Sequence, residues 1–175
     1  MEQLLDGLLV LKFLSGDQAA FEQIVRRYHA SLLYFVRRLI GDGQAAEDVV
    51  QQVWMAAFLE LRRLDHPEAL RVWLYRVARN KAVQMIRHEP PAAVSIDSQE
   101  VLADPEPEFS AHDASRIHLG LAKLSPEHRE VLVLRFLEQL SYDQIAHVVG
   151  CDPGTIKSRL HYAKRMLRRV LEQMP

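Results

Sequence analysis

The sequence predicts an all-helical protein of two small domains, and two observations lead to this fold class. Apolar residues recur with a period of about 3.6 residues, which is typical of amphipathic helices, while the alternation expected of strands is scarce. This periodicity disappears near the middle of the chain and then returns. We therefore expect a helical domain over residues 1–88, a linker over 89–113 and a second helical domain over 114–175. A chain of 175 residues with 49% hydrophobic content can build cores in both.

The periodicity predicts four helices in the N-terminal domain, over residues 4–14, 17–40, 44–63 and 70–87. The apolar run of the first is interrupted by charged residues and is too short to span a bilayer, so we expect a buried helix. Asp17 follows Ser15-Gly16 and is placed to cap the second helix. The run Gly41-Asp42-Gly43 is expected to end that helix.

The predicted linker differs from both domains in composition. It contains seven acids, no Lys or Arg, and several prolines, which is typical of a flexible connection. About 24 flexible residues have a root-mean-square span of roughly 27 Å and reach roughly 80 Å when fully extended. The acidic character has two interpretations: it keeps the segment solvated, or it mimics nucleic acid in a positively charged channel of a partner.

The segment from Leu140 to Arg169 is the most informative part of the chain. A short helix is predicted over 142–149, and Gly150 is placed to end it. Asp152-Pro153 then supplies an N-cap followed by proline at the first position of the next helix. Two helices therefore meet across a very short turn, which predicts a helix-turn-helix.

The second helix of this pair has two different faces. Its apolar face carries Ile156, Leu160, Ala163, Leu167 and Val170, and its other face carries Lys157, Ser158, His161, Tyr162, Arg165 and Arg168. Six Lys or Arg and no acid lie between Pro153 and Leu171, although the chain has a net charge of -1. Phosphate binding depends on such local basic density. A basic stripe alone also fits a solvated surface, but together with the turn it predicts DNA contact.

A second basic helix ends the N-terminal domain. Residues 71–88 hold no acid and five cations, namely Arg71, Arg76, Arg79, Lys81 and Arg87. Asn80 shares one stripe with Arg76, Val83 and Arg87. An exposed asparagine is commonly an ordinary surface residue, but it can also read a base edge. Trp73 is interpreted as a packing residue first and a stacking platform second.

Three segments resemble bacterial alternative sigma factors of the extracytoplasmic-function group, within the sigma-70 family. AAEDVVQQVWMAAF (45–58) is similar to the polymerase-binding helix of that family, and WLYRVARNKAVQMIR (73–87) to its promoter −10 helix. LSPEHREVLVLRFLEQLSYDQIAHVVGCDPGTIKSRLHYAKRML (124–167) resembles its −35 domain. The three segments occur in the family's order and cover most of both domains.

The resemblance implies a role for each set of residues. It places Asp48, Gln51, Gln52 and Trp54 against core RNA polymerase. It places Asp65, His66, Trp73, Arg76, Arg79, Asn80 and Arg87 at the −10 element of promoter DNA, with the loop 64–70 near a flipped base. It places Thr155, Lys157, Ser158, Arg159, His161, Tyr162, Arg165 and Arg168 at the −35 element. An anti-sigma protein is an implied further partner.

At three positions the chain departs from the family pattern. Gln52 stands where the family commonly has Glu, which removes one acidic contact to the polymerase. Gln84 stands where Asp is usual, which puts any role of that acid in doubt. Tyr162 stands where Arg is common in the recognition helix, and a tyrosine cannot fork onto guanine as an arginine does. These departures predict altered polymerase contacts and an altered −35 preference.

We expect no catalytic, cofactor or metal site, because no motif with suitable spacing is present and the single Cys151 has no second cysteine. The expected function is an initiation subunit of RNA polymerase. The alternative is an autonomous helix-turn-helix regulator that binds DNA without polymerase, and an enzyme is a distant third. The expected location is the cytoplasm, on the nucleoid when active and at the inner membrane when an anti-sigma protein holds it there.

Overall fold

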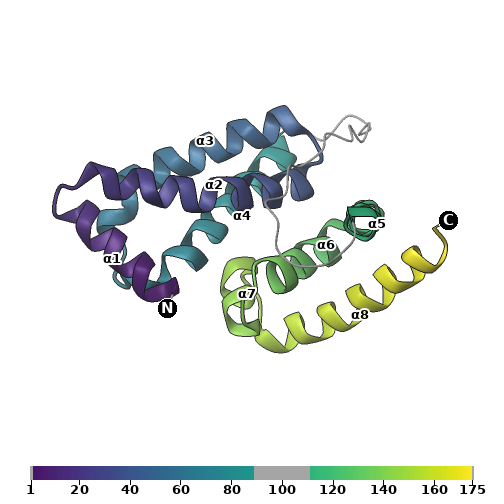
Figure 1. Cartoon of the computed structure of the whole chain (residues 1–175). Coiled ribbons are helices and arrows are strands. Elements are labelled where there is room, and N and C mark those ends of the chain that lie inside the picture. Colours follow the sequence, from purple (N-terminus) through teal and green to yellow (C-terminus); the bar gives the residue numbers. More distant parts are fainter. Residues whose placement is uncertain (1, 89–110, 175) are drawn as a thin grey trace.

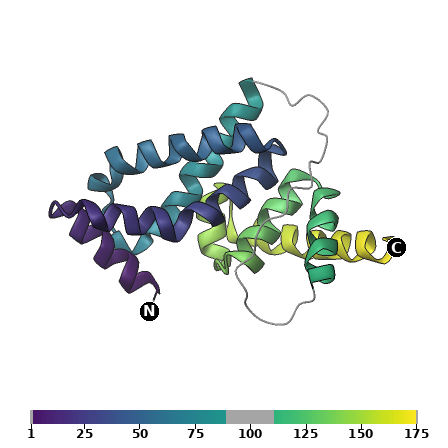
Figure 2. The ribbon, with the colours of Figure 1, turned by 45° about the horizontal axis from the view of Figure 1, so that its top comes forward.

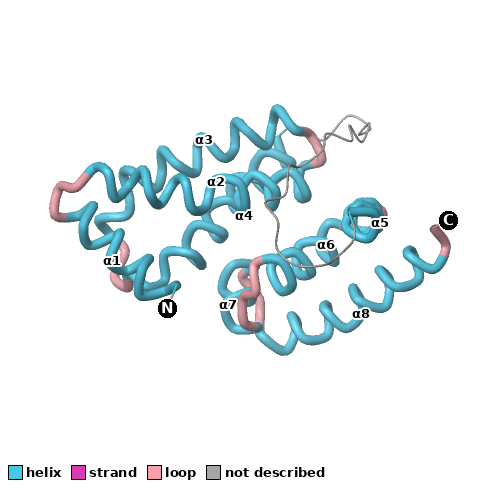
Figure 3. Tube along the Cα trace, viewed as in Figure 1, coloured by secondary structure: helices cyan, strands magenta, loops and turns pink. Residues whose placement is uncertain are grey.

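The computed structural model describes residues 2–88 and 111–174, which form helices joined by short loops with no strand among them (Figure 3). The N-terminal domain contains α1 (Glu2–Leu14), α2 (Gln18–Ile40), α3 (Gly43–Glu60) and α4 (Leu70–His88), with 3-10 turns η1 (Leu61–Arg63) and η2 (Pro67–Ala69) before α4. The C-terminal domain contains α5 (Ala111–Ala122), α6 (Pro126–Leu132), the π-helical turn η3 (Val133–Leu137), α7 (Tyr142–Val149) and α8 (Pro153–Glu172). The all-helical fold class is confirmed. The linker prediction lies mostly outside the described residues.

Local capping signals set the ends of the N-terminal helices. Asp17 accepts a hydrogen bond from the Ala19 amide at 3.0 Å and so caps α2 as predicted. Gly41 ends α2 in the left-handed conformation, with φ 84°. Asp42 then caps α3 by accepting from the Ala45 amide at 3.0 Å. Helices α2, α3 and α4 pack against one another around the core of this domain (Figure 1).

The prediction of a buried first helix is correct for one side of α1 and wrong for the other side. Leu9, Val10 and Phe13 are buried, and the carboxylate of Asp6, 1% exposed, accepts a hydrogen bond from the Tyr28 hydroxyl. Five leucines of α1 are exposed, namely Leu4, Leu5, Leu8, Leu11 and Leu14. The helix is apolar on all sides, whereas its neighbours α2, α4 and η2 cover only one side.

The C-terminal domain packs α6 and α7 against the apolar face of α8. Ile156, Leu160 and Ala163 are buried as predicted, while Leu167 and Val170 are half-buried at the edge of the core. Between α6 and α7 the chain makes a π-helical turn, and Gln139 follows with a positive φ of 51°. This wider turn redirects the chain before α7 begins.

The two domains contact each other, with α4 against α7 and α2 against α6 (Figure 2). Their buried apolar side chains form one continuous cluster. Arg129 of α6 donates to the Arg38 carbonyl at 2.7 Å and also to three carbonyls at the end of α5. The Tyr34 hydroxyl lies 2.7 Å from His118 Nδ1. Within the described residues, no helix is both long and apolar enough to cross a bilayer.

Candidate nucleic-acid interface

The helix-turn-helix is held by a closely defined turn. Ser141 and Gln144 form a capping box at the start of α7, in which each side chain bonds the other residue's backbone amide. Gly150 ends α7 with φ 77°, and its amide donates to the Ala146 carbonyl at 2.8 Å. Asp152 occupies the N-cap position of α8 and Pro153 follows it, as predicted, although the Asp152 side chain makes no capping hydrogen bond. The turn fixes the angle at which α8 leaves α7.

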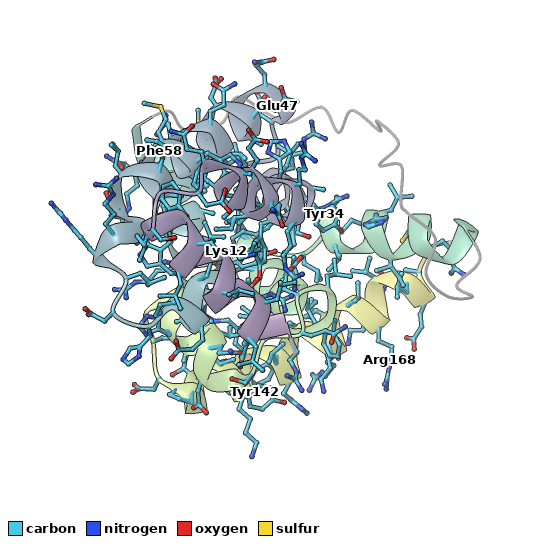
Figure 4. All side chains as sticks on the ribbon, turned by 60° about the vertical axis from the view of Figure 1, so that its left-hand side comes forward. Lys12, Tyr34, Glu47, Phe58, Tyr142 and Arg168 are labelled. Carbon is cyan, nitrogen blue, oxygen red and sulfur yellow. The ribbon has the colours of Figure 1, made fainter. Side chains whose placement is uncertain are left out.

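Most of the residues predicted on the outward side of α8 are exposed together. They are Thr155, Lys157, Ser158, His161, Tyr162, Arg165 and Arg168. Figure 4 shows Arg168 projecting away from the body of the protein. The Tyr162 side chain is 56% exposed and meets the His161 ring edge-on, with the ring centroids 5.6 Å apart. The exposed N-terminus of α8 adds backbone amides and a positive dipole end, which favour phosphate.

Arg159 is placed differently from the other predicted −35 residues. Its side chain is only 21% exposed, and its guanidinium lies 3.8 Å from the Glu127 carboxylate on α6. It therefore flanks the packed side of α8 rather than the centre of the outward face.

In α4, the predicted stripe is exposed at Arg76, Asn80 and Arg87. Trp73 is partly buried and packs against the core, which agrees with its interpretation as a packing residue. Tyr75 lies two residues further along α4 and is fully buried. Its ring meets the Phe35 ring edge-on.

Three arginines of α4 also contact the C-terminal domain. Arg79 Nε donates to Glu130 Oε1 at 2.7 Å, and Arg71 Nη2 donates to Glu138 Oε2 at 3.3 Å. Arg76 Nη1 lies 3.0 Å from His147 Nε2. The two acids are 4% and 6% exposed. Sequence reasoning missed both, because their partners lie 51 and 67 residues away along the chain.

Burial of the Glu130 carboxylate costs solvation free energy. Burial raises the pKa of this carboxyl, and the Arg79 guanidinium lowers the pKa only in part. Glu138 lies beside the Tyr75 hydroxyl, whose pKa is raised first by burial and then by that carboxylate. The contact between α4 and the C-terminal domain therefore contains nearly buried acidic groups paired with arginines.

The loop before α4 is solvent-exposed at Asp65 and His66. His66 Nδ1 lies 3.4 Å from Glu68 Oε1, and Pro67 begins η2 immediately afterwards. Both readings of this loop, as an interhelical connection and as a base pocket, fit that exposure.

The predicted polymerase-binding face lies on the outer side of α3. Asp48, Gln51 and Gln52 are exposed, whereas Glu47 pairs with Arg37 at 2.9 Å. Trp54 is half-buried and donates from Nε1 to His29 Nδ1 at 3.1 Å. Phe58 extends this face as an exposed apolar side chain, and sequence reasoning missed the exposed Met55 and Leu59 beside it. Figure 4 shows Glu47 and Phe58 on the side of the N-terminal domain away from α8.

A helix-turn-helix domain joined to a second helical domain with a basic surface helix is typical of a DNA-binding protein. Comparison with protein families identifies the group. Sigma-70 region 2 matches residues 24–89, and Sigma-70 region 4 matches residues 114–167. The chain belongs to the sigma-70 family, in its extracytoplasmic-function (ECF) group.

Known relatives of similar length support this assignment. The chain is 36% identical to the ECF sigma factor SigL of Mycobacterium tuberculosis, over 91% of this chain and 96% of SigL. It is 30% identical to the ECF sigma-E factor of Escherichia coli, over 99% and 97%. It is 28% identical to the ECF sigma factor SigW of Bacillus subtilis, over 91% and 92%.

Two solved structures share the arrangement of the whole chain. CnrH, in complex with the cytosolic domain of CnrY, is 26% identical with a TM-score of 0.74 and covers 98% of this chain and 99% of its own. The sigma factor RpoE of Bartonella quintana, in complex with the anti-sigma factor NepR, is 26% identical with a TM-score of 0.71, over 89% and 98%. The chain is thus an alternative sigma factor: it binds core RNA polymerase and directs transcription from promoter DNA.

The two helix starts of the helix-turn-helix allow a matched test of capping. We expect Ser141→Ala to lower the free energy of unfolding by about 1 kcal/mol, because the Gln144 backbone amide loses its side-chain acceptor. Asp152→Ala removes only an interaction with the helix dipole and should cost a few tenths of a kcal/mol. Urea unfolding followed by circular dichroism measures both. Equal losses in the two variants would contradict the capping geometry.

Proposed function

We propose that α8 reads the −35 element through its outward face, with Lys157, Ser158, His161 and Tyr162 at base edges. Arg165 and Arg168, further along the same face, contact phosphates. Thr155, beside the exposed N-terminus of α8, contacts a phosphate there. The support is that these side chains are exposed together on one face of a helix held by the turn. Arg159 contributes charge at the edge of this face, since it is partly covered by Glu127.

We further propose that α4 and the loop before it read the −10 element. Arg76, Arg79 and Arg87 supply positive charge along the helix, and Asn80 hydrogen-bonds a base edge. Asp65 and His66 border a pocket for one unstacked base, whose extrusion costs a few kcal/mol and needs compensation. Trp73 supports the helix from below rather than stacking on a base, in keeping with its partial burial.

Helix α3 is the proposed docking surface for core RNA polymerase. Asp48, Gln51 and Gln52 form its polar part, and Trp54 with Phe58 its apolar part. An anti-sigma protein is a proposed partner, because the similar sigma factor RpoE was solved in complex with the anti-sigma factor NepR. The proposed location is the cytoplasm, with the membrane reached only through that partner. We propose no enzymatic activity, in keeping with a family that is generally not enzymatic.

Reconstituted transcription tests the function as a whole. Core bacterial polymerase with the purified chain should produce promoter-dependent transcripts from genomic fragments, and core polymerase alone should not. DNA binding by the chain without polymerase should be far weaker than binding by the holoenzyme. Absence of any dependent transcript would refute the sigma assignment, and strong promoter binding by the chain alone would favour the autonomous regulator.

The role of Asn80 is tested by promoter melting. Asn80→Ala should reduce open-complex formation about tenfold or more, since a bidentate base contact is worth about 1–3 kcal/mol, while polymerase binding stays unchanged. Permanganate footprinting measures the melted bases. Arg26→Ala, which removes an exposed arginine of α2, is the control and should leave melting unaltered. Normal melting with Asn80→Ala would mean that Asn80 is an ordinary surface residue that makes no base contact.

Tyr162 and Arg165 are expected to act in different ways on the −35 element. Tyr162→Arg should change the preferred base pair at one position, with a discrimination of about 1–3 kcal/mol, because arginine forks onto guanine. Arg165→Ala should weaken all sequences similarly and reduce the salt dependence by about one phosphate contact. Selection from randomised −35 elements, with each variant in holoenzyme, measures both. An unchanged preference with Tyr162→Arg would mean that this position does not meet a base.

A further inference from the structure

Helix α1 has an apolar face that no part of the described chain covers. Five leucines project from it, with exposed fractions between 39% and 78%: Leu4, Leu5, Leu8, Leu11 and Leu14. Together these fractions amount to more than two and a half complete leucine side chains, which is roughly 300 Å² of apolar surface or more. This area is comparable to the largest apolar patch of a typical monomer, and such patches often mark sites of interaction. Figure 4 views the molecule from the side on which α1 lies.

The exposed leucines are spaced for packing against another helix. Leu4, Leu8 and Leu11 recur at intervals of four and three residues, which places them in one row along α1. Rows with this spacing are the seams along which two helices pack side by side. Leu8 lies in the middle of the row. A second α1 running antiparallel therefore places Leu8 against its counterpart, and Leu4 against Leu11 of the other copy.

A second apolar surface flanks the C-terminal end of α1. The centroid of the Phe13 ring, at that end, lies 5.6 Å from the centroid of the Phe58 ring of α3, and Phe58 is 50% exposed. Phe58 borders a hollow of about 350 Å³ lined by apolar side chains, namely Trp54, Met55, Phe58 and Leu59. In an antiparallel pair, the N-terminal end of one α1 reaches this end of the other. Leu4, the most exposed of the five leucines, thereby meets apolar surface on the second copy.

The charge of this face favours a second copy over a lipid surface. Helices that lie on membranes carry several Lys or Arg beside their apolar face. Of the α1 residues whose exposure the structure describes, only Lys12 brings a charge to the exposed side. In the antiparallel pair, Lys12 lies beside Leu4 of the other copy, and its methylene stem covers that leucine while the ammonium stays in water. The face is thus complementary to itself.

We propose that the free chain forms a two-fold dimer in which the α1 helices of two copies pack antiparallel through Leu4, Leu8 and Leu11. We call this assembly the α1 dimer. Its apolar contact lies below the roughly 1,200 Å² at which standard interfaces begin, so the dimer is weak, with a Kd of roughly 10–100 μM. Because Phe58 also belongs to the proposed docking surface for core RNA polymerase, the α1 dimer covers part of that surface.

Sedimentation equilibrium of the full chain measures the association. The wild-type chain should pass from monomer to dimer as its concentration rises through the expected Kd. Leu4→Gln, Leu8→Gln and Leu11→Gln combined should weaken association at least about tenfold, because three apolar contacts are removed from each copy. The three side chains are exposed and glutamine is a good helix former, so the variant should keep its fold.

The matched control replaces three exposed apolar residues of the C-terminal domain by glutamine: Leu119, Phe136 and Leu137. This variant should associate as the wild-type chain does. Equal weakening in both triple variants would overturn the proposal, since it would show that association does not depend on α1.

Crosslinking at Leu8 tests the two-fold geometry. In a Cys151→Ser background, which removes the single native thiol, Leu8→Cys should be joined to its counterpart by a short bismaleimide. Leu119→Cys in the same background should remain uncrosslinked. A dimer that is crosslinked equally through both positions would refute the antiparallel α1 contact.

Other occupants of this face give different results. A wild-type chain that stays monomeric well above the expected Kd overturns the α1 dimer. If such a monomer binds vesicles of phosphatidylethanolamine and phosphatidylglycerol through the three leucines, lipid covers the face instead. If the leucine variant of such a monomer loses affinity for core polymerase, polymerase covers it instead.

These outcomes are separate from the proposed function, because sedimentation reports association whether or not the chain supports transcription. A chain that forms the α1 dimer but yields no promoter-dependent transcript would refute the sigma assignment alone. A chain that transcribes but stays monomeric would refute the α1 dimer alone.

Discussion

Arginines that a domain contact takes partly out of water need partners for their guanidinium groups, and in α4 this requirement applies to Arg71 and Arg79 at the contact between the two domains. Arg79 pairs with Glu130, and Arg71 pairs with Glu138. Next to these pairs, α7 packs against α4 and α6 packs against α2. The buried apolar side chains of the two domains form one cluster. The interface therefore combines apolar packing with two nearly buried ion pairs.

Such an interface specifies geometry more than it supplies free energy. Buried ion pairs often contribute little net stability, because desolvation offsets the attraction between the charges. Removing one partner is costly, however, since it leaves a buried charge unpaired. The pairing thus selects one relative orientation of the domains but contributes little to the net free energy of their association. Arg129 adds to the specificity, because its hydrogen bonds join the end of α5 and the Arg38 carbonyl.

Much of the fold was predictable because its signals are local. The Asp17 cap, the Gly41 and Gly150 terminations and the buried face of α8 each depend on residues within two turns of helix, so periodicity and capping rules find them. The exposure of the α8 residues follows from the same periodicity. Asp152 shows the limit of such rules, since the residue type and position were right while its side chain makes no capping bond.

What the sequence did not reveal depends on contacts between distant segments. Helix α1 is apolar all round, so no periodicity indicates that Leu4, Leu8 and Leu11 would face outward. The π-helical turn leaves no composition signal, yet it ends at Glu138, which pairs with Arg71 of α4. Glu130 and Glu138 read as ordinary helix acids until the fold brings them to α4.

Helix α4 contacts the C-terminal domain and is also the proposed −10 helix, which affects how its residues should be interpreted. Arg79 can serve to contact Glu130, to contact DNA, or both. A loss of activity on its substitution does not separate these roles. Asn80 and Arg87 are exposed, whereas Arg79 is paired with Glu130 of the other domain. Substitutions at Asn80 and Arg87 therefore test the proposed promoter contact while the Arg79–Glu130 pair stays in place. Exposed residues and a residue paired across the domain contact thus stand side by side in α4, and separate substitutions at Asn80 and Arg79 distinguish promoter contact from domain packing within one helix.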